Sequence, residues 1–249
     1  MMVVGPTGVG KSSLLNSLMC PAKWSTEFED CHFKTSDTLE SVTKNISQVV
    51  GPWLGENEPP VHLVKVFDTP GLGDSSGLSD IDTLKGIVET INSEPVQAIL
   101  LVFRSKDNVE GSIRLIQKQL RTLEYVLGPQ VWDHVISVFT FWGFSTKDIR
   151  DRVRECIVER KDQFDGVRNY CKEADFENEI AEELKEGYKK YFGVTKTIPH
   201  AFSHPVFDYE DEEERRIFFE NARKIYNYAE NMSALQCDVE CERRLENST

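Results

Sequence analysis

The hydrophobic positions along the chain change period in a regular way. Short apolar runs typical of buried strands alternate with longer segments whose apolar residues recur at helical spacing. The predicted strands are residues 1–4, 61–67, 97–103, 134–140 and a weaker run at 198–202. The predicted helices are one that begins near Lys11, 78–92, 113–127, two or three within 147–192, and 212–232. This alternation predicts an α/β fold with a doubly wound, mostly parallel sheet.

Composition narrows the class of protein. The chain has 249 residues with 29 basic and 42 acidic side chains, a net charge of −13, and 14 Phe, 7 Tyr and 4 Trp that support a sizeable core. An acidic chain is a poor partner for nucleic acid. The longest apolar run, Ala98–Phe103, is far shorter than the roughly 18 residues that a membrane span needs. The N-terminus does not resemble a signal peptide, so a cytoplasmic location is expected.

Two further features have alternative interpretations. The acidic run 208–214 would be a metal-binding cluster or, as we favour, the first turn of the helix that follows it. The cysteines show neither CxxC pairs nor zinc-like spacing, and reduced structural thiols are favoured over disulfides. The six cysteines are Cys20, Cys31, Cys156, Cys171, Cys237 and Cys241.

The strongest chemical signal is GPTGVGKS, residues 5–12, which satisfies the phosphate-loop pattern G-x-x-x-x-G-K-S/T. It lies between a predicted strand and a predicted helix, where successive N–H groups and the helix N-terminus can surround phosphates. Lys11 would reach the β- and γ-phosphates, and the Ser12 hydroxyl would ligate Mg²⁺. The alternative is a plain glycine turn. The expected nucleotide-binding residues of the loop are Gly5, Pro6, Thr7, Gly8, Val9, Gly10, Lys11, Ser12 and Ser13.

The second signal is DTPG, residues 68–71, at the end of the predicted strand 61–67. Ligands of a doubly wound sheet bind beyond the carboxyl ends of its strands. Asp68 is therefore expected beside the phosphates, where it would hold a metal-bound water, and the N–H of Gly71 would meet the γ-phosphate. Taken alone, the motif would also fit a Pro-Gly turn.

Together the two motifs resemble the GTPase superfamily more than general ATPases. A narrower resemblance rests on SSLLNSLMC after the loop lysine, SVTK before the second strand, DTPGLGD, AILLVFR at 98–104 and VWDHVISVFT at 131–140. This order is similar to that of the immunity-associated GTPases, the AIG or GIMAP family, which are relatives of the chloroplast Toc receptors and septins. The resemblance covers residues 1–140 well and 195–232 loosely. It implies that Thr43 is the switch threonine that completes the Mg²⁺ shell; the alternative is a threonine that starts a strand.

The segment expected to contact the nucleotide base departs from the pattern of guanine-specific GTPases. Guanine-specific GTPases carry (N/T)KxD after the strand that 134–140 provides, whereas this chain reads TFWGFS from Thr140, and the STKD at 145–148 is out of register. Trp142 would stack on a purine or would be a core residue, and both interpretations stay open. The family places its last nucleotide motif at the loop that contains Ser203, which makes Ser203 a candidate base contact.

The residues expected to act in phosphoryl transfer are Lys11, Thr43, Asp68, Gly71 and Arg104, and the expected metal ligands are Ser12, Thr43 and Asp68. Leu72 follows DTPG in place of a nearby glutamine, and residues 22–41 hold no arginine, so hydrolysis is expected to be slow or completed by a partner. Relatives in the family dimerise across the nucleotide face. Arg104, at a strand end on that side, is the candidate to act in trans; a plain surface arginine is the alternative.

The sequence therefore predicts a G domain of the AIG type over residues 1–232, with a helical elaboration at 146–192 and a polar tail or helix end at 233–249. The expected function is a guanine-nucleotide switch that binds GTP with Mg²⁺, hydrolyses it slowly to GDP and forms a nucleotide-dependent homodimer. The alternatives are a GTP-binding scaffold with negligible hydrolysis and an ATP-using P-loop enzyme. Only four residues precede Gly5, and the sequence leaves open whether the N-terminus is a natural boundary.

Overall fold

The computed structural model describes residues 1–27, 32–35, 43, 45–56, 58–59, 61–73, 80–105, 109–159, 173–204, 207–237 and 240–247. Within these residues one six-stranded sheet has the order β2-β3-β1-β4-β5-β6. Every neighbouring pair is parallel except the antiparallel pair β2–β3, so the predicted mostly parallel sheet is confirmed. The strands are β1 (Met2–Val4), β2 (Ser47–Pro52), β3 (Leu63–Asp68), β4 (Ile99–Arg104), β5 (Val135–Thr140) and β6 (His200–Phe202).

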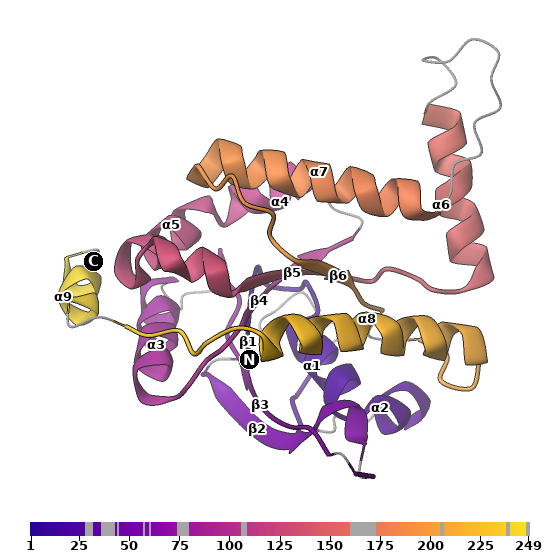
Figure 1. The fold of residues 1–249 in the computed structure, drawn as a ribbon, viewed down its shortest axis with the longest axis horizontal. Helices are drawn as coiled ribbons and strands as arrows, with labels where there is room; N and C mark the ends of the chain where they lie inside the picture. The colour runs from indigo at the N-terminus through magenta and orange to yellow at the C-terminus, as the bar shows by residue number, and fades with distance from the viewer. Residues whose placement is uncertain are drawn as a thin grey trace.

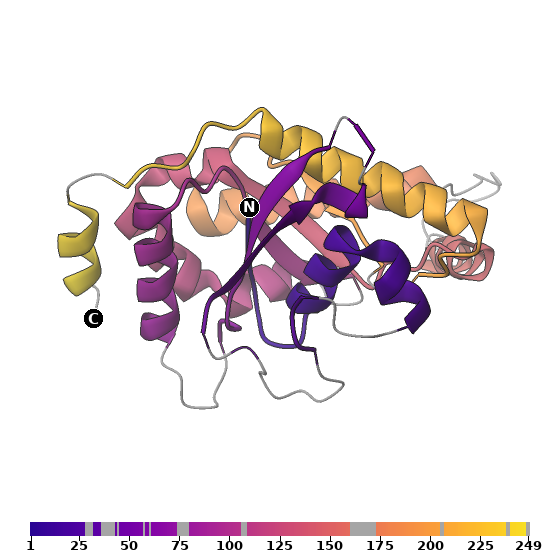
Figure 2. The same ribbon diagram turned by 90° about the horizontal axis from the view of Figure 1, so that it is seen from below.

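Helices cover both faces of the sheet, as a doubly wound fold requires. Figure 1 shows α4, α5 and α7 on one side and α1 and α8 on the other, and Figure 2 looks onto the side of α1, α2 and α8. No helix of the described part of the chain is long and apolar enough to cross a membrane. The helices are α1 (Lys11–Met19), α2 (Pro21–Glu27), α3 (Asp80–Ser93), α4 (Val109–Leu115), α5 (Gln117–Leu127), α6 (Thr146–Glu159), α7 (Glu173–Phe192), α8 (Glu212–Glu230) and α9 (Cys241–Glu246), with short 3₁₀ turns η1 (Trp53–Gly55) and η2 (Pro129–His134).

The inner strands β1, β4 and β5 form the core of the sheet. Every residue of β1 and β5, and all of β4 except Arg104, is buried. Because helices cover both faces of these strands, each reads as a continuous apolar run. Their parallel direction brings the carboxyl ends of β1, β3, β4 and β5 to one edge of the sheet, where a ligand site is expected.

Two elements differ from the periodicity of the sequence. β2, the second strand that the motif order places after residue 44, has no apolar period, because this edge strand exposes residues on both faces. The single helix predicted for 113–127 is wrong: α4 and α5 are separated at Ile116, whose φ of −107° and ψ of 14° are not helical. The other predicted elements are present with ends shifted by a few residues.

The C-terminal residues continue along the molecule after α8. Leu235 forms an antiparallel bridge with Val96, and its side chain is buried. The α9 helix packs against α5, where Nε of Arg244 donates to the carbonyl of Val126 at 3.0 Å. This segment therefore adds contacts at the edge of the sheet opposite to the carboxyl ends of the strands.

The cysteines do not all match the expectation of reduced thiols. Cys237 and Cys241 are free, and Cys241 is fully buried in α9. Cys20, however, takes part in a disulfide. The expectation is therefore wrong for Cys20, since the spacing of cysteines along a sequence does not reveal which of them meet in space.

Candidate functional site

The predicted phosphate loop joins β1 to α1. A β-carbon at Gly5 would lie 2.5 Å from the carbonyl oxygen of Val102, so only glycine fits against β4. Gly10 caps α1 with a φ of 82°, and a β-carbon there would lie 3.1 Å from the ring of Phe141. Because these two glycines have no side chains, the loop backbone packs closely on its neighbours and its N–H groups stay accessible, as a phosphate-binding loop needs.

Lys11 lies across this loop and is buried, with 7% of the residue exposed. Its Nζ donates to the carbonyl oxygens of Gly5 at 3.2 Å and Pro6 at 2.8 Å. These carbonyls hold the ammonium group over the loop, at the place where the β- and γ-phosphates are expected.

The three predicted metal ligands meet at one point. Oγ of Ser12, on α1, donates to Oδ2 of Asp68 at 2.6 Å, and Oγ1 of Thr43 donates to the same oxygen at 3.1 Å. The two hydroxyl oxygens are 3.3 Å apart. Residues from the start of α1, the segment before β2 and the end of β3 are therefore brought together as the sequence predicted.

The donor set of this cluster suits a hard divalent cation. Asp68 is 1% exposed, and its Oδ1 has no hydrogen-bond partner among the described residues. Burial raises the pKa of Asp68, against the opposing effects of the Ser12 hydrogen bond, the Lys11 charge and the Thr43 hydrogen bond. A buried carboxylate with a spare oxygen and two hydroxyls matches the oxygen ligands that Mg²⁺ prefers. We conclude that Ser12, Thr43 and Asp68 fit the expected metal.

The turn after Asp68 packs directly on the phosphate loop. The N–H of Leu72 donates to the carbonyl of Gly5 at 3.0 Å, and Leu72 forms a bridge with Pro6. A β-carbon on Gly71 would fall on the side chain of Thr7. Oγ1 of Thr7 is buried and has no hydrogen-bond partner among the described residues, so a polar donor or acceptor is available where Gly71 and the loop meet.

Trp142 occupies a core position rather than an open platform. The residue is 5% exposed, and its ring packs on Phe202 with ring centres 4.3 Å apart. The guanidinium of Arg152 lies 4.4 Å from the centre of the Trp142 ring. This is the packing of the core alternative, and stacking of Trp142 on a purine stays a prediction.

Sequence reasoning missed what Thr140 and Phe141 do. Oγ1 of Thr140 donates to the carbonyl of Val9 at 2.6 Å and to that of Phe103 at 3.0 Å, which ties the phosphate loop to β5 and β4. Phe141 has a φ of 59°, rare for a residue with a side chain, and its ring lies against Gly10. Their place in the sequence could have indicated this role, since Thr140 and Phe141 stand where the first two residues of the (N/T)KxD motif are expected.

Ser203 lies beside Trp142 at the end of β6. Its carbonyl accepts from the N–H of Trp142 at 3.1 Å, and its own N–H donates to Phe139 at 2.7 Å. The Ser203 hydroxyl is buried with no hydrogen-bond partner among the described residues. A fixed backbone with an unused hydroxyl is consistent with the expected base contact.

The STKD sequence is a helix cap. The N–H of Asp148 donates to Oγ of Ser145 at 3.1 Å, just before α6 begins at Thr146. The Ser145 hydroxyl also donates to the Asp148 carboxylate. Both polar groups serve the start of α6, in agreement with the prediction that this sequence does not provide the base motif.

Arg104 ends β4 at the nucleotide edge, as expected. Its side chain is exposed, and its guanidinium carbon lies 4.9 Å from the centre of the Phe141 ring. The arginine is therefore next to the phosphate loop and reachable from outside, which both the catalytic and the plain surface interpretation allow.

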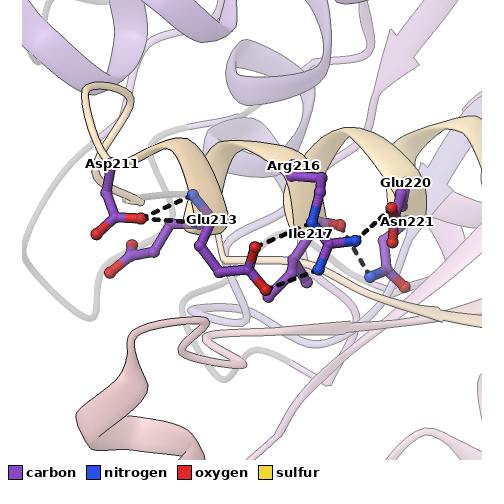
Figure 3. Close-up of polar contacts among 7 residues, drawn as sticks. Asp211, Glu213, Arg216, Ile217, Glu220 and Asn221 are labelled. Atoms are coloured by element: carbon purple, nitrogen blue, oxygen red, sulfur yellow. Dashed lines mark hydrogen bonds and ion pairs between the residues drawn. The ribbon is translucent and has the colours of Figure 1, made fainter.

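The acidic run 208–214 starts α8. The carboxylate of Asp211 accepts from the N–H groups of Glu213 at 2.9 Å and Glu214 at 3.0 Å, and Arg216 pairs with Glu213 and Glu220 on the following turn (Figure 3). No group of three or more His, Cys, Asp or Glu suited to a metal is found among the described residues. The favoured interpretation as an acidic first turn is confirmed.

The sheet order and the glycine-rich loop after β1 define a P-loop fold of the GTPase type. Within that class, the chain belongs to the AIG1 family, whose sequence profile matches residues 1–190. The resemblance to immunity-associated GTPases is thereby confirmed.

Two curated relatives from Arabidopsis thaliana match part of the chain. Immune-associated nucleotide-binding protein 13 is 29% identical over 143 residues, which are 56% of this chain and 37% of that protein. Translocase of chloroplast 132, chloroplastic, is 31% identical over 141 residues, which are 54% of this chain and 10% of that protein. The matched region thus spans little more than a third of the first relative and a tenth of the second.

Solved structures of Toc33 from Arabidopsis thaliana share the fold. Toc33 in complex with Mg²⁺ and GMPPNP has a TM-score of 0.58 at 16% identity, covering 94% of this chain and 85% of that chain. A dimerisation-deficient Toc33 mutant, in which an arginine is replaced by alanine, has a TM-score of 0.57 at 16% identity, covering 94% and 86%. At this identity the likeness establishes the fold.

Proposed function

We propose that this chain is a guanine-nucleotide switch that binds GTP with Mg²⁺ and hydrolyses it slowly to GDP. The observation that carries the proposal is the convergence of Ser12 and Thr43 on the Asp68 carboxylate, beside the buried ammonium of Lys11. The name of one relative, immune-associated nucleotide-binding protein 13, and the Toc33 complex with Mg²⁺ and GMPPNP support it.

Each group at the site has a role in this proposal. Lys11 exchanges the carbonyls of Gly5 and Pro6 for phosphate oxygens and offsets their charge. Ser12 and Thr43 would hold Mg²⁺ through their hydroxyls, and Asp68 would hold a metal-bound water. When bound there, the ion would neutralise charge on the β- and γ-phosphate oxygens. Thr43 reports the triphosphate, since switch segments are ordered by γ-phosphate and Mg²⁺ contacts.

On the base side, Ser203 is the proposed contact that favours guanine, because its hydroxyl is buried and its backbone is fixed. The backbone N–H of Trp142 donates a hydrogen bond to the Ser203 carbonyl and so holds the backbone of Ser203 in place. Thr140 ties the phosphate loop to the base side of the site, because its hydroxyl donates a hydrogen bond to the Val9 carbonyl.

Slow hydrolysis and pairing complete the proposal. Leu72, an apolar and buried residue, follows the metal-side turn where a glutamine would orient water. Arg104 is exposed at the nucleotide edge and is the residue we propose to act across a homodimer. The dimerisation-deficient arginine mutant of Toc33 supports an arginine as a dimer contact in a protein of this fold. We further propose a cytoplasmic location.

Competition binding tests the proposal directly. GTP and ATP are competed against a fluorescent guanine nucleotide, with Mg²⁺ and with EDTA, on the unmodified chain and on Lys11→Ala. We expect GTP to bind more tightly than ATP, Mg²⁺ to strengthen binding, and Lys11→Ala to lose about a hundredfold or more in affinity. Lys118→Ala, on exposed α5 surface, is the matched control and is expected to bind normally.

The alternatives predict other results in the same assays. An ATP affinity equal to or above that of GTP would support an ATP-using enzyme. Tight GTP binding with no single-turnover hydrolysis at any protein concentration would support a scaffold. Nucleotide affinity unchanged in Lys11→Ala would contradict the assignment of the phosphate loop itself.

A further inference from the structure

A carboxylate at the start of α3 joins two distant parts of the chain. Oδ1 of Asp80 accepts from the backbone N–H of Gly73 at 2.8 Å. Oδ2 of the same carboxylate accepts from Nε2 of Gln119, on α5, at 2.6 Å. The α3 and α5 helices pack against each other, as the side-by-side helices in Figure 1 show. We call Gly73, Asp80 and Gln119 the Asp80 clasp.

The chemistry of Gln119 fixes how its side chain faces Asp80. A carboxylate only accepts, so the amide nitrogen of Gln119 must face Asp80. The amide oxygen is then left buried with no hydrogen-bond partner among the described residues, and the residue as a whole is 9% exposed. An apolar side chain could bury the same helix face, but it could not donate to Asp80, so the amide of Gln119 is the group that links α5 to this carboxylate.

The clasp acts on the turn that closes the phosphate site. Gly73 follows Leu72, whose N–H is bound to the carbonyl of Gly5, and Gly71, which packs on Thr7. Gly73 itself has a left-handed φ of 76°, a conformation that glycine adopts readily. The phosphate loop therefore holds one end of the 71–73 turn, and the clasp holds the other.

We propose that Asp80 and Gln119 are positioning residues that set the response of the site to the γ-phosphate. They reach neither nucleotide nor metal; they fix the backbone of Gly73 and thereby the direction of the Gly71 N–H. The inference rests on the proposed function, in which that N–H meets the γ-phosphate, and it adds α5 to the elements that control the switch.

Two single variants and the double variant that exchanges the charge between positions 80 and 119 test the clasp. Gln119→Glu sets two carboxylates against each other and should release Gly73. In Asp80→Asn, the side-chain oxygen still accepts from the N–H of Gly73. If the Gln119 amide rotates by 180°, the new amide nitrogen at position 80 donates to the Gln119 oxygen, so both contacts are kept. In the double variant Asp80→Asn/Gln119→Glu, the asparagine amide donates to the new carboxylate, so the contact is rebuilt. Gln117→Glu on the same helix is the matched control.

The readout is the ratio of affinities for GMPPNP and GDP with Mg²⁺, together with the melting temperature. We expect Gln119→Glu to lower GMPPNP affinity about tenfold and to leave GDP affinity within about twofold, the size of an ordinary coupling between sites. Asp80→Asn, the double variant and Gln117→Glu should keep the ratio of the unmodified chain. If Gln119→Glu does not fold, Gln119→Leu replaces it, since it removes the donor without adding charge.

The outcomes separate the inference from the function on which it rests. An unchanged ratio in Gln119→Glu, an equal loss for both nucleotides, or a double variant as weak as the single one would overturn the positioning role alone. A failure of the unmodified chain to bind either nucleotide would overturn the proposed function and the inference together.

Discussion

A β-carbon on Gly71 would lie 1.9 Å from Oγ1 of Thr7, far inside the distance at which two such atoms can approach. It would also lie 2.7 Å from Cα of Thr7, so rotation of the threonine side chain does not relieve the overlap. The turn after Asp68 and the phosphate loop are consequently in backbone contact. A change on one side must displace the other.

Gly71→Ala follows directly from this contact. We expect the variant to push the turn away from the phosphate loop and to lose about tenfold or more of its affinity for GMPPNP, with a smaller loss for GDP. Titration calorimetry with both nucleotides measures it. Gly86→Ala is the control, because its β-carbon would meet only the flexible side chain of Ile46 at 3.3 Å. Wild-type GMPPNP affinity in Gly71→Ala would contradict the role of this turn.

Thr43 should distinguish triphosphate from diphosphate. We expect Thr43→Ala to weaken Mg²⁺-dependent binding of GMPPNP but not of GDP, because its hydroxyl is proposed to complete the metal shell only when the γ-phosphate is present. Ser12→Ala should weaken both. Thr43→Ser keeps the hydroxyl and is expected to behave like the unmodified chain. If Thr43→Ala weakened both nucleotides equally, the threonine would be a structural residue instead.

The Ser203 hydroxyl should carry part of the base preference. We expect Ser203→Ala to narrow the gap between GTP and ATP affinity, by a fold-change typical of one lost hydrogen bond, about three- to tenfold. Competition assays with both nucleotides measure the gap, and Ser93→Ala, on the surface of α3, is the control. A gap that is unchanged in Ser203→Ala would place guanine selection elsewhere.

Arg104 should matter only when two copies meet. We expect triphosphate-dependent self-association, a specific hydrolysis rate that rises with protein concentration, and the loss of that rise in Arg104→Ala. An arginine supplied in trans is worth roughly 10³–10⁵ in rate. Light scattering with GMPPNP and single-turnover hydrolysis measure the two effects, with Arg114→Ala on α4 as the control. A monomer whose rate is independent of concentration would exclude this mechanism.

Acid should destabilise the fold partly through His200. Burial, and next the charge of Lys224, hold the pKa of His200 below its ordinary value of 6.5. As pH falls through about 6.5, the unfolded chain therefore takes up the proton first, and the free energy of unfolding decreases until the pH reaches the lower pKa of the folded state. We expect His200→Gln to lose less stability over this interval, as measured by urea unfolding at several pH values. His32→Gln, at an exposed position, is the control, and equal acid loss in both variants would contradict the prediction.

The sequence predicted the parts of the fold that are buried on both faces. β4 and β5 read as apolar runs because helices cover both sides of them, whereas β2 has no such run because it lies at the sheet edge. The break at Ile116 was invisible because the apolar stripe continues through it from Ile113 to Leu120. Periodicity reports which face is buried, and it does not report where a backbone turns.

The candidate site divides in the same way. Lys11, Ser12 and Asp68 were predictable because loop and strand-end motifs fix them locally and parallel strands bring their ends together. Thr43 was expected only from the resemblance to a known family. The Asp80 clasp was not predictable, because Gln119 is distant in sequence and its role depends on how two helices pack. The packing of Arg152 on Trp142 could not be predicted for the same reason. In a sequence, an aromatic residue at the end of a strand is equally compatible with a core position and with a ligand-binding surface.

The position of β1 at the centre of the sheet has a consequence for how the protein folds. Met2 pairs with Phe67 on one side and with Ile99 on the other, so this strand of three residues is held by partners from much later in the chain. Contacts between such distant residues form slowly, because a long loop must close before they gain any free energy. We therefore expect completion of the sheet around β1, rather than formation of any single helix, to limit the folding rate.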